Sequence, residues 1–181
     1  MLDARPTLYL LVGLPGAGKT TRSRVLEVEQ RALRFSPDEW MIPLYGDSDS
    51  DGMRDVLEGR LIATALRVME LGASVILDFG FWGRDERSAL RWLADAQGAA
   101  CVIIYLPVGE AVQRQRVEER FGSTPEETFA LSGDDLDQYR GLFQVPDQAE
   151  LAGTRLDPPP QGSPSWAAWA NVRWPSLNAD K

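Results

Sequence analysis

A glycine-rich stretch near the start of the chain, GLPGAGKT at residues 13–20, has the residue types of a phosphate-binding loop. Gly13, Gly18, Lys19 and Thr20 satisfy the spacing G-x-x-x-x-G-K-[ST], with an apolar run before the stretch and a helix-compatible run after it. Glycines let backbone N–H groups turn inward around a phosphate, and the following helix N-terminus adds its partial positive charge. We therefore expect Lys19 to bridge the β- and γ-phosphates of ATP, and the Thr20 hydroxyl to ligate Mg²⁺. The nucleotide-binding residues predicted from this loop are Gly13, Gly16, Ala17, Gly18, Lys19, Thr20 and Thr21.

A second stretch, RFSPDEW at residues 34–40, places two carboxylates directly after a short apolar run. Two interpretations stay open for Asp38. Ser36 and Glu39 have the spacing of a helix capping box, in which Asp38 would only favour the helix dipole. Alternatively, Asp38 lies just past a strand end, where ligands of open α/β sheets bind, and takes the proton of a phosphate-accepting hydroxyl. If the second strand runs beside the first, Asp38 faces the γ-phosphate.

A third carboxylate, Asp78, ends the apolar run SVILD. It has the place of a Walker B carboxylate, which would hold a Mg²⁺-bound water through Thr20 or contact the acceptor. The simpler alternative is an aspartate that caps the next turn. The following FGFWGRDER supplies Trp82, Arg84 and Arg87, a mix suited to an aromatic-walled acceptor pocket. Trp82 equally suits a core position.

Four short apolar runs, separated by segments of helical character, must position these side chains. They are LYLLVG (8–13), ALRFS (32–36), SVILDF (74–79) and CVIIYLP (101–107). This alternation predicts an α/β fold with a mostly parallel sheet and helices on both faces. Between the second and third runs, a loose apolar stripe predicts one buried helix face. Its members are Met53, Val56, Leu57, Thr64, Val68 and Leu71.

The succession of GLPGAGKT, FSPDEW and VILDFGFWGRDER resembles the small P-loop kinase group that includes polynucleotide kinase, the zeta toxins and chloramphenicol phosphotransferase. It also resembles bacterial proteins labelled AAA-family ATPases, and the resemblance covers roughly residues 7 to 150. It implies a P-loop NTPase fold of nucleoside-kinase type with Asp38 as the general base. In polynucleotide kinase an arginine that serves the nucleic-acid phosphate closely follows this aspartate. Here Glu39, Trp40 and Met41 follow, which weakens a polynucleotide substrate.

Arginines gather after the fourth apolar run, in EAVQRQRVEERFG. Nucleoside-kinase-like folds carry lid arginines at this point, which neutralise charge on the transferring phosphoryl group, and one often stacks on adenine. The resemblance therefore implies a catalytic role for at least one of these arginines, without distinguishing which. We assign the catalytic role to Arg116 and Arg120 and nucleotide binding to Arg114. Nearby glutamates leave the alternative of surface i,i+4 pairs.

Composition restricts the function classes further. With 181 residues, 44% of them hydrophobic, the chain suits one domain with a full core. A formal net charge of -8 disfavours a groove for a long nucleic acid, because phosphate neutralisation needs a basic face. The absence of histidine excludes histidine catalysis and ordinary His/Cys zinc sites. Cys101 lies inside an apolar run and is expected to be a small core residue.

Targeting signals and membrane spans are not apparent in the sequence. Residues 1–20 lack the order of a signal peptide, and no run approaches eighteen apolar residues. We expect a soluble cytoplasmic protein without a membrane partner, either a monomer or a homodimer.

The composition changes at Asp157, where a proline-rich stretch precedes three tryptophans. We therefore divide the chain into a P-loop kinase domain over residues 1–156 and a Pro/Trp-rich tail over 157–181. Ser163 is expected to cap a short helix in which Trp166 and Trp169 share a face. Exposed tryptophans on this scale are rare in soluble monomers, so the tail is expected to dock onto the kinase body or a second subunit.

These observations favour an ATP- and Mg²⁺-dependent kinase that phosphorylates a hydroxyl of a small molecule, such as an antibiotic or a metabolite. One alternative is a kinase of nucleic-acid 5'-hydroxyls, which the negative charge disfavours. Another is a nucleotide-binding ATPase or switch that acts through a protein partner, with the tryptophan-bearing tail as the contact.

Overall fold

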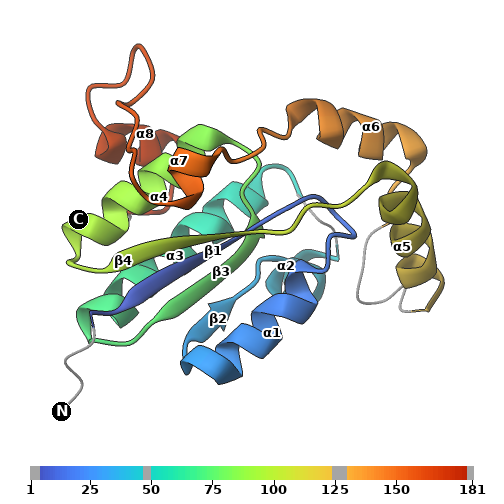
Figure 1. Ribbon diagram of the computed structural model, residues 1–181, viewed down its shortest axis with the longest axis horizontal. Helices are drawn as coiled ribbons and strands as arrows, with labels where there is room; N and C mark the ends of the chain where they lie inside the picture. Colours follow the sequence, from blue (N-terminus) through green and yellow to red (C-terminus); the bar gives the residue numbers. More distant parts are fainter. Residues whose placement is uncertain (1–4, 47–49, 124–129, 179–181) are drawn as a thin grey trace.

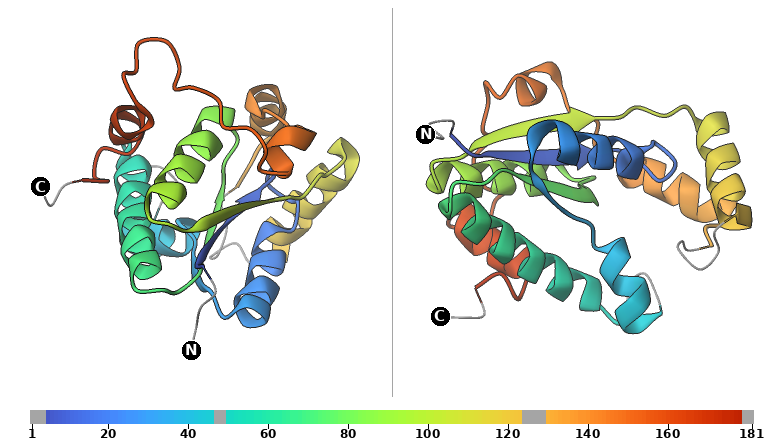
Figure 2. Two further views of the ribbon diagram at one scale, coloured as in Figure 1. Left: turned by 60° about the vertical axis from the view of Figure 1, so that its left-hand side comes forward. Right: turned by 90° about the horizontal axis from the view of Figure 1, so that it is seen from below.

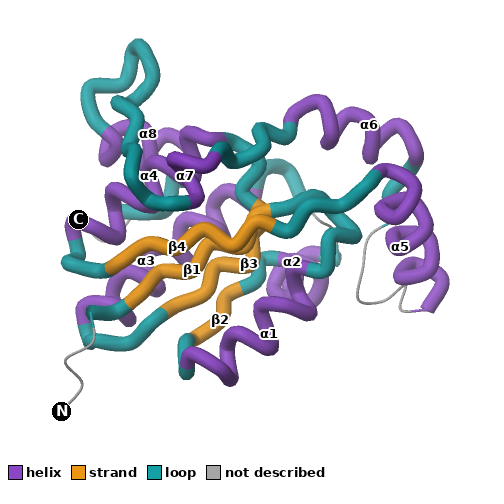
Figure 3. Tube along the Cα trace, viewed as in Figure 1, coloured by secondary structure: helices purple, strands orange, loops and turns teal. Residues whose placement is uncertain are grey.

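The computed structural model describes residues 5–46, 50–123 and 130–178, which form a parallel sheet with helices on both faces (Figure 1). The strands, drawn as orange tubes in Figure 3, are β1 (Thr7–Val12), β2 (Leu33–Phe35), β3 (Val75–Gly80) and β4 (Ala100–Tyr105). They lie in the order β2-β3-β1-β4, and every pairing is parallel. The α/β fold with a parallel sheet and helices on both faces, expected from the four apolar runs, is confirmed.

Helices connect the strands and extend beyond them. They are α1 (Lys19–Gln30), α2 (Asp38–Tyr45), α3 (Met53–Glu70), α4 (Arg84–Ala96), α5 (Glu110–Ser123), α6 (Gly133–Leu142), α7 (Gln148–Leu151) and α8 (Trp166–Arg173). Figure 2 shows α3, α4 and α8 on one side of the sheet and α1 on the other. The helices α5 and α6 stand beyond the carboxyl ends of the strands (Figure 1).

Side chains of the sheet alternate between two apolar layers, because successive residues of a strand point to opposite faces. In β1, Leu8 and Leu10 belong to the larger layer, which also contains buried residues of α3, α4 and α8. Leu11 belongs to the smaller layer with Leu26 of α1. Cys101 is partly buried against the larger layer, in agreement with its predicted core position.

The placement of Asp38 was predicted on the condition that the second strand runs beside the first. This condition is not met, because β3 lies between β2 and β1. The physical reason lies in burial. Val75, Ile76 and Leu77 of β3 are fully buried, so this strand is apolar on both faces and takes an inner position. By contrast, β2 has three residues and begins with the half-exposed Leu33, which suits an edge.

The buried face of α3 also differs from the predicted stripe. Its buried residues are Glu58, Gly59, Leu61, Ile62, Ala65 and Met69. Leu71, which the stripe placed inside, is 88% exposed. The apolar periodicity was ambiguous there because a charged residue, Glu58, and a glycine occupy the buried face.

The C-terminal segment folds against the main body. Trp166 and Trp174 are buried members of the larger apolar layer, and Trp169 packs between them with ring centroids 5.8 Å from each. Docking of these tryptophans onto the main body of the chain, one of the two expected outcomes, is therefore confirmed. The predicted cap is wrong by two residues, because Ser165 rather than Ser163 accepts from the Ala168 N–H at 3.1 Å.

The division at residue 157 stays a prediction.

In the described ranges, no helix is both long and apolar enough to cross a membrane.

Candidate active site

The loop between β1 and α1 takes a conformation that its glycines permit. Gly16 and Gly18 have φ values of 77° and 88°, in the left-handed region that favours glycine. A Cβ atom at Gly13 would lie 2.8 Å from the carbonyl oxygen of Leu106, so the loop packs tightly against the chain beyond β4. The helix α1 begins at Lys19, so the N–H groups of its first turn lie at the loop, as an anion site requires.

Lys19 projects from this loop into a charged environment. Its Nζ donates a hydrogen bond to the carbonyl oxygen of Leu14 at 3.0 Å. Burial lowers the pKa of the Lys19 ammonium, while the carboxylates of Asp78 and Asp38 act in the opposite direction. Both carboxylates therefore lie close enough to Lys19 to act on its charge.

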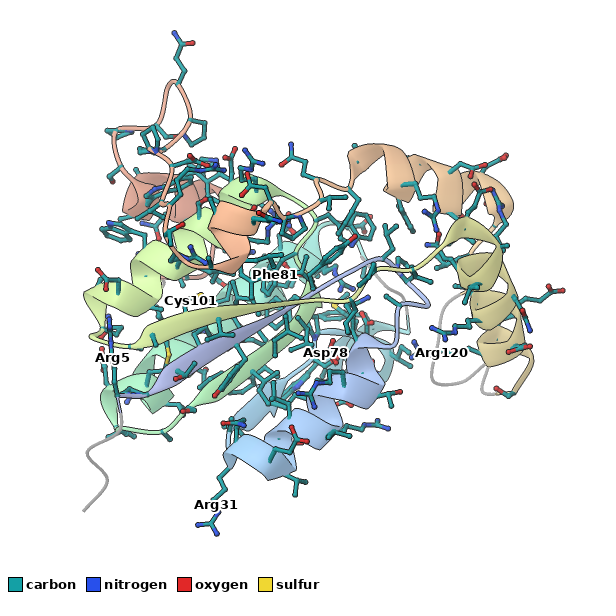
Figure 4. The ribbon with its side chains drawn as sticks, viewed as in Figure 1. Arg5, Arg31, Asp78, Phe81, Cys101 and Arg120 are labelled. Carbon is teal, nitrogen blue, oxygen red and sulfur yellow. The ribbon has the colours of Figure 1, made fainter. Side chains whose placement is uncertain are left out.

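Asp78 lies within β3, two residues before the strand ends, and next to α1 (Figure 4). Its Oδ2 accepts a hydrogen bond from Ser23 Oγ at 2.7 Å and lies 3.3 Å from Nη1 of Arg34. Ser23 Oγ also lies 3.0 Å from the carbonyl oxygen of Thr20. Burial raises the pKa of Asp78, and the Ser23 hydrogen bond and Lys19 reduce that shift. The carboxylate is therefore held against the turn that carries Thr20, rather than capping the next turn.

Asp38 begins α2 and its side chain is about half exposed, at 48%. Its Oδ1 accepts from Nη1 of Arg54 at 2.9 Å. The capping box expected at this helix does not form, because no side chain caps its first turn. Glu39 instead pairs with Arg34 and, at 3.4 Å, with Arg24. Arg34, the central residue of β2, thus draws Glu39 away from the cap position.

One cavity of about 940 Å³ brings the predicted residues together. Those that line it are Gly16, Gly18, Lys19, Thr20, Thr21, Asp38, Asp78, Trp82, Arg116 and Arg120. Asp38 reaches the cavity although β2 is not beside β1, because it begins α2 three residues after the end of β2, at the carboxyl edge of the sheet. Among the described residues, five predicted ones are not part of the wall, namely Gly13, Ala17, Arg84, Arg87 and Arg114. Gly13 and Ala17 belong to the phosphate loop but are buried.

The arginines of α5 divide into two groups. Arg116 and Arg120 line the cavity, and Nη1 of Arg116 donates to the carbonyl oxygen of Gly16 at 3.3 Å. Figure 4 shows Arg120 on the side of α5 that faces α1. Arg114 pairs with Glu110 one turn away and with Asp137 of α6. For Arg114, the surface-pair alternative therefore fits its placement and nucleotide binding does not.

Residues at the end of β3 and directly after it form an aromatic wall of the cavity. Phe79, Phe81 and Trp82 line it, and the Trp82 ring packs on Tyr139 of α6 with centroids 4.6 Å apart. Phe81 has a φ of 38°, which a bulky residue adopts only under strain. This turn directs the aromatic residues back over the phosphate loop, where Gly13 N–H donates to the Gly80 carbonyl oxygen at 3.2 Å.

The predicted acceptor contacts of Arg84 and Arg87 are not supported by their placement. Arg87 is 1% exposed, pairs with Glu150, and donates to the carbonyl oxygen of Phe81 at 3.0 Å. Arg84 lies 3.2 Å from Asp147 and 3.7 Å from Glu150. Arg87 therefore supports the aromatic turn, whereas the side chain of Arg84 pairs with carboxylates of the C-terminal part.

Several charged residues of the cavity wall were not predicted. They are Arg24, Arg54, Asp55, Glu58, Glu86 and Arg173. The i,i+4 spacing of Arg54 and Glu58 was a visible signal of a pair, and their Nε and Oε1 atoms are 3.0 Å apart. No signal in the sequence indicated that Arg173 reaches the cavity.

The donors near the phosphate loop fit a nucleotide-bound Mg²⁺. Mg²⁺ uses few protein ligands and completes its shell with water and phosphate oxygens. Thr20 and Asp78 supply a hydroxyl and a carboxylate on the wall of one cavity. Throughout the described ranges, no three Cys, Asp or Glu residues form a group that could hold a metal by themselves.

Comparison with solved structures supports the fold. A candidate kinase from Chloroflexus aurantiacus J-10-fl is 22% identical, with a TM-score of 0.63 over 90% of this chain and 86% of that one. Kti12 of Chaetomium thermophilum, in complex with ADP-AlF3, is 21% identical, with a TM-score of 0.64 over 94% and 98%. A gluconokinase from Sinorhizobium meliloti 1021 is 15% identical, with a TM-score of 0.57 over 98% and 94%. At these identities the likeness shows a P-loop kinase-like fold.

A search of curated proteins found no significant match. The family model described as "AAA domain" matches residues 8–146, from the start of β1 past the end of α6. This range contains the phosphate loop, all four strands and the arginines of α5. Because the match covers most of the chain, the protein belongs to this AAA domain family.

Proposed function

We propose that this protein is an ATP- and Mg²⁺-dependent phosphotransferase that phosphorylates a hydroxyl group of a small molecule. The observation that carries the proposal is the shared cavity, in which Lys19 of the phosphate loop, Asp78 and Asp38 meet. An NTPase needs the first two, whereas a carboxylate beyond them has a use when a second substrate is present. The kinase-like fold of the structural neighbours supports the same class.

The phosphate end of the cavity suits a nucleotide. The loop N–H groups and the Lys19 ammonium would hold the β- and γ-phosphates, and Thr20 and Asp78 would hold Mg²⁺. When bound, Mg²⁺ would neutralise charge on the phosphate oxygens. Arg116 and Arg120 approach from α5, where their positive charge can act on the transferring phosphoryl group.

Asp38 is the residue we assign to the acceptor. The acceptor oxygen forms a bond to the γ-phosphorus while the bond from that phosphorus to the leaving oxygen of ADP breaks. The proton of the acceptor hydroxyl passes to Asp38 and then to solvent. A half-exposed carboxylate on the cavity wall can both meet a substrate and release the proton.

The size and charge of the site favour a small acceptor. A cavity of about 940 Å³ is at the upper end of ordinary ligand sites, which suits a nucleotide with a small second substrate. The net charge of -8 still disfavours a long nucleic acid. The switch alternative loses its proposed contact surface, because Trp166 and Trp174 are buried in the protein's own core.

A transfer screen tests the proposal. The full chain is incubated with γ-labelled ATP and Mg²⁺ against pools of sugars, amino alcohols, nucleosides, antibiotics and 5'-hydroxyl oligonucleotides. We expect label in a small-molecule product with the wild type and none with Lys19→Ala, which removes the charge that the phosphates need. Label in the oligonucleotide pool alone would overturn the small-molecule assignment. ATP hydrolysis without a labelled product in any pool would favour the switch.

A further inference from the structure

The carboxylate of Asp38 is linked to the C-terminal helix through side chains of α3. Asp38 Oδ1 accepts from Nη1 of Arg54 at 2.9 Å, and Nε of the same guanidinium donates to Oε1 of Glu58 at 3.0 Å. Trp174 Nε1 donates to Oε2 of Glu58 at 3.3 Å, and Nη2 of Arg173 lies 3.8 Å from that oxygen. The contacts thus run from the end of α8, through α3, to the start of α2.

Arg173 lies where carboxylates of two other elements converge. Its Nη1 pairs with Asp55 of α3, and its Nε donates to Oε1 of Glu86 in α4 at 2.9 Å. Glu86 Oε2 accepts from the N–H of Gly83, at the end of the aromatic turn. Asp55, Glu86 and Arg173 all line the same cavity as Asp38. The C-terminal helix therefore supplies part of the cavity wall.

We infer that Arg54, Glu58 and Arg173 are positioning residues, which hold Asp38 toward the phosphate loop, so that α8 completes the active site. The inference rests on the proposed role of Asp38. It assigns to the C-terminal segment a function in the reaction beyond its contribution to the core.

The physical reason is a competition for positive charge. Four carboxylates, those of Asp38, Asp55, Glu58 and Glu86, face the guanidiniums of Arg54 and Arg173 at this end of the cavity. Glu58 is 5% exposed, and removing one partner of a buried ion pair leaves a charge uncompensated. Without Arg173, the remaining carboxylates would draw Arg54 away from Asp38.

The burial of Glu58 supports this account. Burial raises the pKa of Glu58 to about 7, and the two neighbouring guanidiniums limit the rise. At neutral pH Glu58 is therefore about half ionised, and loss of either arginine would raise its pKa further. Loss of either arginine would therefore weaken the ion pair between Glu58 and the other arginine.

Kinetics of a double-mutant cycle test the inference, with MgATP as the probe and water as the phosphoryl acceptor. We expect Arg173→Gln and Glu58→Gln each to lower kcat for ADP release about tenfold, with KM for ATP unchanged. Added to Asp38→Asn, they should have little further effect, because they act through Asp38. Arg173→Lys, which keeps the charge, should recover part of the loss. Effects that multiply with Asp38→Asn would overturn the inference.

A spectroscopic readout separates this inference from the proposed function. In ¹⁵N spectra of the full chain, the Nε–H signal of Arg54 should exchange with water about tenfold faster in Arg173→Gln. An unchanged signal would overturn the positioning role. If Asp38→Asn leaves ADP release unchanged while the Arg54 signal responds, the proposed base fails and the link from α8 to Arg54 stands. Should Arg173→Gln not fold, the near-isosteric Glu58→Gln carries the same expectations.

Arg155→Gln is the matched control. Arg155 also lies in the C-terminal part and also pairs with two carboxylates, Asp147 at 2.8 Å and Asp157 at 2.9 Å. It has no contact with the chain of residues that leads to Asp38. We expect unchanged kcat and an unchanged Arg54 signal.

Discussion

Asp38 has positive charge on two sides, and this decides what a substitution there would do. Lys19 is near enough for the carboxylate to act on its ammonium, and Arg54 donates to it at 2.9 Å. A neutral amide of the same shape keeps a hydrogen bond to Arg54 but cannot take a proton from an acceptor. The substitution Asp38→Asn therefore separates the proposed role of Asp38 as a base from its role in holding Arg54.

We predict that Asp38→Asn lowers kcat for acceptor phosphorylation by roughly 10²-fold with little change in the affinity for ATP. The stability should change little, because no side-chain cap depends on Asp38. Rate measurements with the acceptor found in the screen, and ATP titrations, check both parts. Near-normal kcat would return Asp38 to a structural role.

Glu58 is the residue whose titration should affect stability. Its ordinary pKa of 4.5 applies in the unfolded chain, and burial raises it to about 7 in the folded one. Between these values the folded state binds more protons than the unfolded state. The resulting stabilisation is complete below pH 4.5 and is lost as the pH rises through about 7.

We predict that the wild type loses on the order of 3 kcal/mol of this stabilisation across that window, while Glu58→Gln does not. The measured quantity is the difference in free energy of unfolding between the two proteins, from denaturant titrations at several pH values. That difference should move in favour of the variant as the pH rises. Parallel curves for the two proteins would contradict the raised pKa.

At the scale of elements, α3 connects the core to the site. Its buried face carries apolar residues that pack under the sheet. The same face carries Glu58, which pairs with Arg54 and Arg173, and Gly59, which lies close to the C-terminal segment. A Cβ atom at Gly59 would lie 2.5 Å from Ser176 Oγ and 3.0 Å from the Leu177 nitrogen. Position 59 therefore requires glycine because the C-terminal segment approaches α3 closely there, and not because of the backbone φ angle.

We predict that Gly59→Ala lowers the free energy of unfolding by about 1–3 kcal/mol, because the C-terminal segment must shift away from α3. Gly141→Ala is the matched control, since Gly141 is also helical but a Cβ there would meet nothing within 4 Å. The control should be stabilised by about 0.5–1 kcal/mol, the helix propensity difference. Denaturant unfolding measures both, and equal effects would contradict the close contact.

At the scale of the whole molecule, the C-terminal helix closes one face of the sheet. Trp174 is fully buried in the larger apolar layer, together with Trp166 and Ala170. The same helix places Arg173 on the cavity wall. Core packing and the proposed active site therefore share one structural element.

We predict that Trp174→Ala lowers the free energy of unfolding by about 3–5 kcal/mol, the usual result of removing a large buried aromatic side chain. Val172→Ala is the control in the same helix, because Val172 is 83% exposed, and it should change stability by less than about 0.5 kcal/mol. Deletion of residues 158–181 should lower the melting temperature further. A melting temperature that survives the deletion would show that the helix is dispensable to the core.

The phosphate loop and the fold class could be predicted from the sequence because both depend on local patterns. The loop needs a strand, a glycine turn and a helix within consecutive residues, and Gly16, Gly18 and Lys19 make that turn recognisable from the local sequence alone. The parallel sheet follows from four apolar runs that must all be buried. The position of Asp38 on the cavity wall was also inferred, although from a strand order that proved wrong.

The tertiary structure alone decided which charged residues meet. Arg34 and Asp78 are 44 positions apart, Trp174 and Glu58 are 116 apart, and Arg173 and Asp55 are 118 apart. The ion-pair partner of a charged residue cannot be read from sequence periodicity, because it depends on which face of a helix packs against the core. Because the buried face of α3 was set by the sheet and by α8, only the folded chain could show that Glu58 lies between Arg54 and Arg173.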